Sequence, residues 1–253
     1  MFDLHGRRAV VVGGTSGIGR AISLGLAGAG ADVVATSRSA EAVDTVAGEI
    51  EALGRCTLRM TTNILNRASL QALHDRVVSD LGCVDILVNS AGITKRIPTL
   101  DCSEEDWGEI MDVNLKGTLY GCQIFGQSMI QRGYGRIINI ASLATFVAFQ
   151  EVAAYGASKA AVGALTRSLA VEWAQTGVCV NAIAPGIIPT GLNRAIIESA
   201  RGQELLLRTP MRRFGKPQEM VGATVYLASE ASSFITGQIL AVDGGYLASG
   251  VNQ

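Results

Sequence analysis

Two side chains that could move a proton, Tyr155 and Lys159, lie four residues apart in a segment whose pattern predicts a helix. Positions i and i+4 share one face of an α-helix, so the phenol and the ammonium would point into the same space. A phenol with an ordinary pKa of about 10 is a weak acid–base catalyst at neutral pH, and a neighbouring ammonium favours the phenolate. The pair is therefore a candidate for general acid–base chemistry at a carbonyl or an alcohol.

A third candidate, Ser142, closely follows the apolar run Arg136–Ile140 and lies thirteen residues before Tyr155. Its hydroxyl could donate a hydrogen bond to a carbonyl oxygen on which negative charge grows during hydride addition. A Tyr-x-x-x-Lys pair by itself is also a common surface pattern. Its chemical meaning therefore depends on the motifs around it.

A glycine-rich stretch, GGTSGIG at Gly13–Gly19, follows the apolar run Ala9–Val12 and precedes a helical pattern. Glycines let a backbone approach a pyrophosphate, whose charge is stabilised at a helix N-terminus. The alternative is a turn that needs glycines only for close strand–helix packing. The first interpretation predicts phosphate contacts from Gly13, Thr15, Ser16, Gly17, Ile18 and Gly19.

The residues after the second apolar run, Val33–Thr36, bear on the choice of dinucleotide. In many such folds an acidic residue at this place binds the ribose 2′-hydroxyl, but here the chain reads Ser37-Arg38. A guanidinium would hold a 2′-phosphate that a carboxylate would repel. The pattern predicts a preference for NADP(H), with NAD(H) still possible. The alternative is that Arg38 is a solvated loop charge.

Short apolar runs alternate with helical patterns along the whole chain, which predicts βαβ units and a parallel sheet covered on both faces. No linker or break in composition divides the chain, so we expect one domain over residues 1–253. The predicted strands are Ala9–Val12, Val33–Thr36, Thr57–Met60, Val84–Val88, Arg136–Ile140, Val178–Ile183 and Ile239–Val242. The predicted helices are Ile18–Ala29, Ala40–Leu53, Arg67–Leu81, Glu104–Gln131, Ala153–Gln175, a weaker Gly191–Arg208, and Pro217–Ser229.

The composition excludes several classes of protein. Of 253 residues 48% are hydrophobic, and the net charge of −1 argues against disorder and against nucleic-acid binding. Five cysteines without a C-x-x-C pair and only two histidines indicate neither a disulfide framework nor a metal site. No signal peptide is evident, and no uncharged apolar run approaches the roughly 20 residues that span a bilayer. We therefore expect a cytoplasmic protein with a small-molecule substrate.

Taken together, these motifs resemble the short-chain dehydrogenase/reductase family over essentially the whole chain. The matching pieces are GGTSGIG, NSAG at Asn89–Gly92, VNLKG around Asn114, Ser142, YGASK and Pro185-Gly186. The resemblance implies a single-domain α/β Rossmann fold with a seven-stranded parallel sheet in the order 3-2-1-4-5-6-7. It also implies an oxidoreductase that is usually a homotetramer.

The family resemblance implies a role for each member of a four-residue relay. Tyr155 is similar to the general acid–base, and Ser142 to the residue that orients the substrate oxygen. Lys159 would bind the nicotinamide ribose and lower the pKa of the tyrosine. Asn114 would hold a water that continues the relay. Further cofactor contacts are expected from Asn63, Ile64, Asn89, Ala91, Gly92, Pro185, Gly186, Ile188 and Thr190.

Three positions depart from the usual family pattern, and none touches the proton transfer. Val12 stands where the family usually has Thr, and Ser90 replaces the second Asn of NNAG. Asn63 stands where an Asp commonly meets the adenine amino group, and its carbonyl can still accept that hydrogen bond.

Basic residues near the expected substrate end suggest an acidic substrate. Lys95 and Arg96 follow the fourth predicted strand, and Arg194 lies in a lid expected at about 190–210. Cations there could fix a carboxylate or a phosphate, with Gln150 as a further candidate contact. The segments GITKRIPTLD and DGGYLASG resemble family members that act on sugar acids, such as gluconate or deoxygluconate dehydrogenases. We expect a keto sugar acid or a polyol as substrate. The alternative is that Lys95 and Arg96 are solvated.

Three other functions share part of this pattern. A 3-oxoacyl-carrier-protein reductase has the same catalytic motifs and would need a basic patch, which Arg208, Arg212 and Arg213 could supply. An NADP-binding sensor or scaffold, or a methyltransferase on a similar fold, would not need Tyr155. The complete Ser142, Tyr155 and Lys159 set therefore favours an enzyme.

Overall fold

The computed structural model describes residues 2–191 and 199–250 of the chain. Within them, six parallel strands form one sheet in the order β2-β1-β3-β4-β5-β6. The strands are β1 Arg8–Val12, β2 Asp32–Thr36, β3 Ile86–Asn89, β4 Gly135–Ile140, β5 Val178–Pro185 and β6 Ile239–Val242. Most residues of β1 to β5 are buried, as expected for β-branched runs covered on both faces of a parallel sheet.

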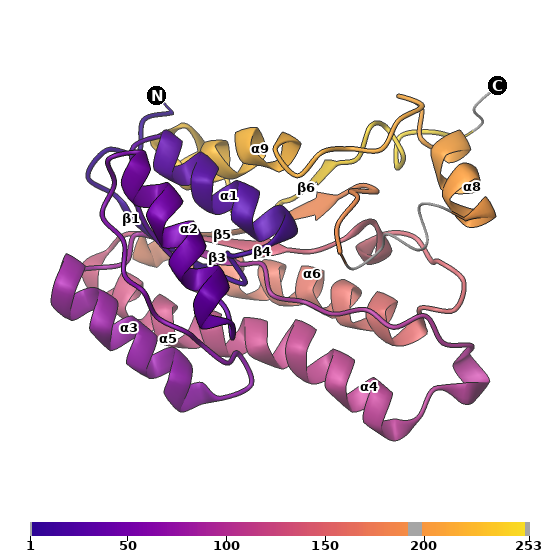
Figure 1. Cartoon of the computed structure of the whole chain (residues 1–253), viewed down its shortest axis with the longest axis horizontal. Helices are drawn as coiled ribbons and strands as arrows, with labels where there is room; N and C mark the ends of the chain where they lie inside the picture. The colour runs from indigo at the N-terminus through magenta and orange to yellow at the C-terminus, as the bar shows by residue number, and fades with distance from the viewer. Residues whose placement is uncertain (1, 192–198, 251–253) are drawn as a thin grey trace.

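Helices cover both faces of the sheet (Figure 1). Apolar side chains of α1, α2 and α9 form one core against the sheet, and those of α3, α5 and α6 form the other. The helices are α1 Gly17–Gly28, α2 Ala40–Ala52, α3 Arg67–Leu81, α4 Glu104–Met111, α5 Gly117–Arg132, α6 Ala153–Trp173, α8 Ala200–Arg208 and α9 Glu219–Ala228. The predicted doubly wound α/β fold is confirmed.

Local sequence signals explain where helix α3 begins and ends. The side chain of Asn66 caps its start by accepting a hydrogen bond from the Ser69 amide. Gly82 ends it with a φ of 91°, a conformation that favours glycine. The predicted bounds of this helix are therefore confirmed at both ends.

The predicted third strand, Thr57–Met60, is wrong, so the sheet has six strands instead of seven. The segment does run beside β2, and Val33 N–H donates to Cys56 O (3.0 Å) while Thr62 N–H donates to Ser37 O (2.9 Å). Between these two bonds the contact is made by a side chain, the Thr36 hydroxyl, which donates to Met60 O (2.7 Å). No continuous backbone ladder forms, and the order of the other strands is as expected.

The predicted helix Glu104–Gln131 is interrupted by a turn of π-helix at Asp112–Lys116. Such turns inside α-helices are rare and occur often at functional sites. Asn114, a predicted site residue, lies in the middle of this turn and is fully buried. In the weaker predicted helix Gly191–Arg208, residues 192–198 lie outside the described residues, and Ala200–Arg208 is helical.

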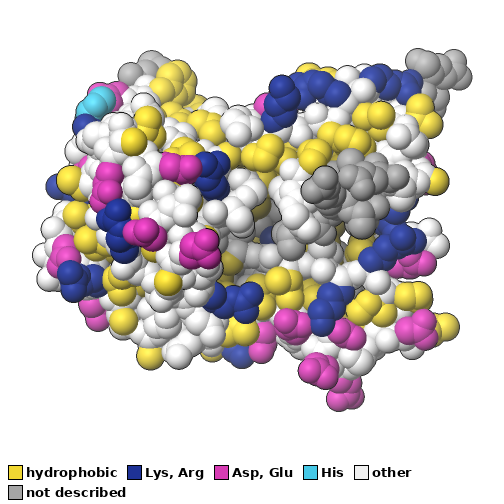
Figure 2. All heavy atoms as spheres, in the orientation of Figure 1, with side chains coloured by type: hydrophobic (Ala, Val, Ile, Leu, Met, Phe, Trp, Pro, Cys, Tyr) yellow, Lys and Arg dark blue, Asp and Glu magenta, His cyan; other side chains and the backbone are white. Residues whose placement is uncertain are grey.

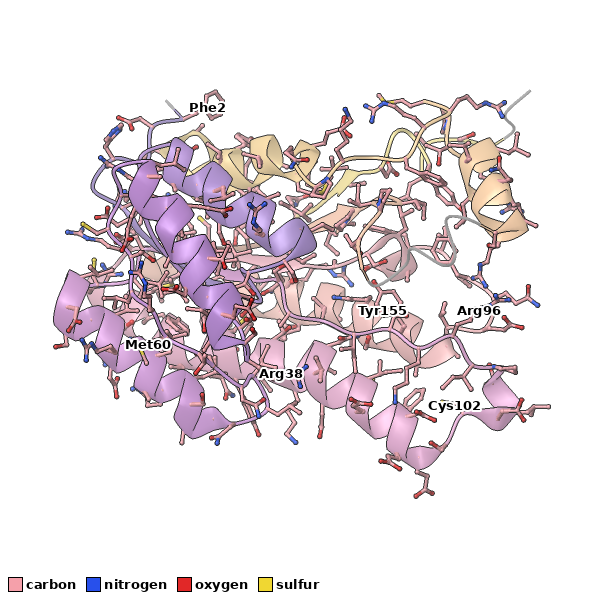
Figure 3. All side chains as sticks on the ribbon, viewed as in Figure 1. Phe2, Arg38, Met60, Arg96, Cys102 and Tyr155 are labelled. Atoms are coloured by element: carbon pink, nitrogen blue, oxygen red, sulfur yellow. The ribbon has the colours of Figure 1, made fainter. Side chains whose placement is uncertain are left out.

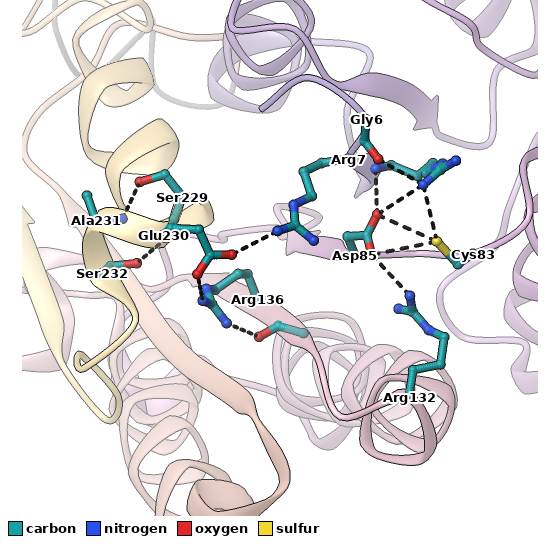
Figure 4. Close-up of polar contacts among 12 residues, drawn as sticks. Gly6, Arg7, Cys83, Asp85, Arg132, Arg136, Ser229, Glu230, Ala231 and Ser232 are labelled. Atoms are coloured by element: carbon teal, nitrogen blue, oxygen red, sulfur yellow. Dashed lines mark hydrogen bonds and ion pairs between the residues drawn. The ribbon is translucent and has the colours of Figure 1, made fainter. Parts of the chain in front are cut away.

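Charged side chains tie together the end of the sheet where the strands begin (Figure 4). The carboxylate of Asp85, just before β3, accepts a hydrogen bond from the Arg132 guanidinium at 3.0 Å. Glu230 accepts from Arg7 at 2.9 Å and from the buried Arg136 at 3.3 Å. These contacts connect β1, β3, β4 and α5 at the edge opposite the strand ends that carry the catalytic motifs. Among the described helices, none has the length and apolar character needed to cross a membrane.

Candidate active site

A cavity of about 620 Å³ opens at the carboxyl ends of the strands. Residues that follow β1, β2, β3, β4 and β5 all contribute to its wall. Figure 2 shows the surface hollowed in this region, with acidic and basic side chains around the hollow. Ligands of open α/β sheets bind at this edge, where the direction of the strand order reverses, so its position fits an extended dinucleotide.

The glycine loop forms one end of the cavity and is packed against the loop after β3. Gly13 has a φ of 79°, and a Cβ added there would lie 2.6 Å from the Ala91 nitrogen. A Cβ on Gly19 would lie 2.0 Å from Gly13 O, so both positions require glycine for packing. Ser16 precedes α1 and makes no side-chain capping bond, which leaves the first amides of the helix to an anion. The loop therefore fits a pyrophosphate.

Arg38 lies after β2, is exposed and lines the cavity beside Ser37 (Figure 3). It makes no ion pair or hydrogen bond with the residues that the structure describes. Asn63, on the neighbouring wall, accepts a hydrogen bond from Leu65 N–H at 3.1 Å. A guanidinium without a protein partner, next to the pyrophosphate loop, is suited to a 2′-phosphate.

Tyr155 lies in the first turn of α6, where it is half-buried, and it lines the cavity together with Ser142. Burial raises the pKa of the phenol, and the nearby Ser142 hydroxyl opposes that rise. Lys159 is buried one turn further along, with its Nζ 5.9 Å from the centre of the Tyr155 ring. Lys159 donates to Ile140 O at 2.7 Å, and burial lowers its pKa to about 8.

Burial determines the direction of the Tyr155 pKa, and the lowering of that pKa by Lys159 stays a prediction. A lysine with a pKa of about 8 is also only partly charged just above neutral pH. Tyr155 therefore stays a phenol at neutral pH. This is the form that donates a proton to a ketone oxygen during reduction.

Asn114 connects the loop after β3 to helix α6. Its Oδ1 accepts from Ile93 N–H at 2.8 Å, and its Nδ2 donates to Ile93 O and to the Ser158 hydroxyl, both at 2.9 Å. A Cβ on Gly92 would lie 3.2 Å from Asn114 Oδ1 and 3.4 Å from Lys159 Nζ, so the amide and the ammonium flank the same glycine. Asn114 thus ties the loop after β3 to Ser158, the residue that precedes Lys159 on α6. Its role in holding a water stays a prediction.

Comparisons with known proteins agree with this arrangement. The family model described as enoyl-(acyl carrier protein) reductase matches residues 12–247. The 2-dehydro-3-deoxy-D-gluconate 5-dehydrogenase of Escherichia coli K12 is 41% identical, with 98% of each chain covered. The chain belongs to the short-chain dehydrogenase/reductase family. Gluconate 5-dehydrogenase of Gluconobacter oxydans 621H is 38% identical, also with 98% of each chain covered.

A solved structure of the same family confirms the fold. The crystal structure of a gluconate 5-dehydrogenase from Burkholderia cenocepacia J2315, in complex with NADP and tartrate, superposes with a TM-score of 0.95. It is 39% identical and 98% of each chain is covered. Like its relatives, this short-chain dehydrogenase is an oxidoreductase.

Most of the predicted site residues of this short-chain dehydrogenase lie around one cavity. The structure places there Gly13, Ser16, Gly17, Ile18, Gly19, Ser37, Arg38, Asn63, Ile64, Ala91, Gly92, Ser142, Tyr155, Lys159, Pro185, Gly186, Ile188 and Thr190. It does not place there Thr15, Asn89, Lys95, Arg96, Asn114 or Gln150. The Asn89 amide instead donates to Asn139 at 2.9 Å inside the core. Arg194 lies outside the described residues.

The two cations expected at the substrate end of this short-chain dehydrogenase are held by carboxylates. Lys95 lies between Asp106 at 2.7 Å and Glu109 at 2.6 Å. Arg96 is hydrogen-bonded to Glu151. Neither cation lines the cavity. Binding of substrate by these two cations therefore remains a prediction.

Sequence reasoning missed several residues of the cavity wall. Glu109, Phe149, Val152 and Leu205 line it, and so does Arg201 from α8. One signal was available for Arg201, because the helical stretch Gly191–Arg208 was expected to cover the site and any basic residue in it was a candidate. The spacing of residues along this stretch could not show which of its arginines lines the cavity.

Proposed function

We propose that this chain is an NADP(H)-dependent oxidoreductase that interconverts a ketone and a secondary alcohol on a sugar acid. The observation that carries the proposal is one cavity with Ser142, Tyr155 and Lys159 in its wall and an unpaired Arg38 after β2. The first group suits proton transfer at a carbonyl, and the second suits the phosphorylated cofactor.

The chemistry of the chain's own residues follows from their positions. When bound, the nicotinamide supplies or accepts the hydride. During reduction, Ser142 donates a hydrogen bond to the ketone oxygen and Tyr155 gives that oxygen its proton. The carbonyl π bond breaks, the carbon gains the hydride, and the oxygen gains the proton to give the alcohol. Tyr155, having lost that proton, becomes a phenolate. Lys159 stabilises this phenolate until a proton returns from solvent.

Relatives support the cofactor and the substrate class. The gluconate 5-dehydrogenase of B. cenocepacia was crystallised with NADP and with tartrate, a hydroxy acid. Two relatives near 40% identity are named for gluconate or a deoxygluconate. We assign NADP and sugar acids to this chain on the basis of these relatives and of the unpaired Arg38. Polyols are the second substrate class.

The structure weakens the basic patch that a 3-oxoacyl-carrier-protein reductase would use. Arg208 pairs with Glu204 at 3.4 Å, and Arg213 pairs with Glu219 at 2.6 Å. Two of the three arginines that could meet an acidic carrier are therefore partly neutralised. We therefore prefer a sugar acid to a carrier-bound 3-oxoacyl thioester as the substrate.

The proposed function is tested by NADPH oxidation with a panel of substrates. The purified chain is assayed with keto sugar acids, ketoses and 3-oxoacyl thioesters, each with NADPH and with NADH. We expect the highest kcat/KM with a keto sugar acid and NADPH. A preference for thioesters, or no turnover of any ketone, would contradict the proposal.

We also propose that residues 1–253 work as one catalytic domain, with a lid at about 190–210, in a cytoplasmic homotetramer. Arg201 and Leu205 of the lid region line the cavity, which supports a covering role. Val171 on α6 is 81% exposed and Phe234 is fully exposed, which supports burial against other subunits. Light scattering after gel filtration tests the assembly, and a monomer would refute it.

A further inference from the structure

Arg201 of helix α8 lines the cavity and is attached to the segment that joins two catalytic residues. Its Nη2 donates a hydrogen bond to Gln150 O at 2.8 Å, and its side chain is 19% exposed. Gln150 lies between Ser142 and Tyr155 along the chain. Phe149 and Val152, which lie in this segment, line the same cavity as Ser142 and Tyr155, so the bond attaches the guanidinium to that part of the wall.

The other end of the guanidinium is buried without a hydrogen-bond acceptor. Nη1 of Arg201 makes no hydrogen bond with the residues that the structure describes. Among the described residues, the carboxylate oxygen paired with it is Oε2 of Glu151, which is 3.9 Å away and already accepts a hydrogen bond from Arg96. Among the described residues, two guanidinium groups thus share one carboxylate, and these three side chains carry one net positive charge. A buried charged donor without an acceptor is costly, so this place is complementary to an anion.

The other charged groups described in the cavity wall have different tasks. Arg38 lies after β2 beside the glycine loop, and Lys159 donates to Ile140 O next to Tyr155. Glu109 is paired with Lys95. Arg201 is therefore the cation among the described lining residues that neither the expected cofactor phosphates nor the proton transfer accounts for.

We propose that Arg201 binds the carboxylate of the sugar-acid substrate and determines the preference for acids over neutral sugars. This inference rests on the proposed function and names a residue of its site. The planar guanidinium can present two N–H groups to a carboxylate, a geometry that an amide or an ammonium cannot reproduce. Arg201, Ser142 and Tyr155 line one cavity, so a substrate anchored at Arg201 lies in the same space as the two catalytic hydroxyls.

The test compares a matched pair of substrates that differ in one group. L-sorbose carries a hydroxymethyl group where 5-keto-D-gluconate carries its carboxylate. In R201Q we expect KM for 5-keto-D-gluconate to rise about 10- to 100-fold, the range for loss of one charged hydrogen bond. KM and kcat for L-sorbose should stay within about twofold, since a neutral substrate gains nothing from the charge. R201K should lie between wild type and R201Q for the acid.

The matched control is R208Q, on the same helix and paired with Glu204, which should leave both substrates unchanged. Thermal melting checks that R201Q and R201K are folded. An unchanged KM for the acid in R201Q overturns the proposal, and so does an equal rise for the acid and for L-sorbose, which would show a structural role.

A binding experiment separates this inference from the proposed function. If wild type turns over no ketone, the proposed function fails, but titration calorimetry of 5-keto-D-gluconate into the NADP⁺-loaded protein still decides the role of Arg201. Binding to wild type that is lost in R201Q supports the anchor. Binding that persists in R201Q, or no binding to wild type, overturns it.

Discussion

Burial of the charged Lys159 side chain lowers the free energy of unfolding of this protein. It is buried, its Nζ has one protein acceptor, and burial lowers its pKa to about 8 from the ordinary 10.5. Between pH 8 and 10.5 the unfolded chain binds a proton at this lysine that the folded chain has lost, so the free energy of unfolding rises with pH. Below pH 8 the full cost of the buried charge is present. In the proposed mechanism, the same charge stabilises the Tyr155 phenolate.

Replacement of Lys159 by a methionine of similar volume should therefore stabilise the fold and abolish the activity. At pH 7 we expect K159M to gain up to about 3 kcal/mol in the free energy of unfolding, from the pKa difference of about 2.5. The gain should shrink between pH 8 and 10.5. Urea unfolding at pH 7 and pH 10 measures both values, while ketone reduction should fall at least about 100-fold. A variant less stable than wild type at pH 7 would refute this account.

Arg38 makes a prediction about the choice of cofactor. R38A should lower kcat/KM for NADPH about 10- to 100-fold and leave that for NADH within about threefold, because only NADPH carries the phosphate. The comparison is R59Q, on the outer surface, where Arg59 is paired with Asp44 and Glu51. Steady-state kinetics with both cofactors measures these values. An equal loss of kcat/KM with NADPH and with NADH would contradict the role of Arg38.

At the scale of elements, the π-turn between α4 and α5 brings Asn114 under the loop after β3. The turn places the amide so that it bonds both backbone groups of Ile93 and the hydroxyl of Ser158. It therefore links three elements whose relative positions set the distance from Gly92 to Lys159. A regular helix through this region would rotate the side chain away.

The variant N114A should lose both stability and turnover. Removal of the amide leaves buried backbone groups without partners, which costs about 2–4 kcal/mol in the free energy of unfolding. We also expect kcat to fall at least tenfold. The matched control is N181A, since Asn181 is equally buried and bonds Ile235 O (2.8 Å) and Gln238 N–H (3.0 Å) away from the cavity. N181A should lose similar stability with kcat within about twofold. If both variants lose kcat equally, Asn114 has no special link to the site.

At the scale of the whole molecule, the two ends of the sheet do different work. The ends where strands begin are held by the ion pairs of Asp85 and Glu230, and the ends where strands finish surround the cavity. The residues that hold the sheet together at one end therefore lie a full strand length away from the residues that line the cavity. Substitutions at the first end should change the free energy of unfolding without changing catalysis.

D85N tests this separation. Asp85 is almost fully buried and accepts from Arg132 and from the Arg8 amide, so loss of its charge should cost about 3–5 kcal/mol. Glu230 is 58% exposed but its partner Arg136 is buried, so E230Q should cost less than D85N, about 1–3 kcal/mol. Chemical denaturation measures both costs. In assays at 20 °C, where the variants remain folded, kcat/KM should stay within about twofold. A large loss of kcat in folded D85N would show that the two ends are coupled.

Much of this protein could be predicted from local patterns in the chain. The alternation of apolar runs and helical segments determined the doubly wound fold, because burial on both faces of a parallel sheet imposes that pattern. The glycine loop, Arg38 and the Tyr155–Lys159 spacing are each set by a few neighbouring residues, so their shared location follows from the edge at which parallel strands end.

Only the tertiary structure decided which charges are free and which strands pair. Lys95 and Arg96 looked available in the sequence, but Asp106, Glu109 and Glu151 reach them from other elements. Thr57–Met60 has the residues of a strand, yet its contact with β2 is a side-chain bond where a ladder would be needed. Pairing of strands and of charges depends on distances between segments far apart in the chain, and Arg201 became visible as a cavity residue for the same reason.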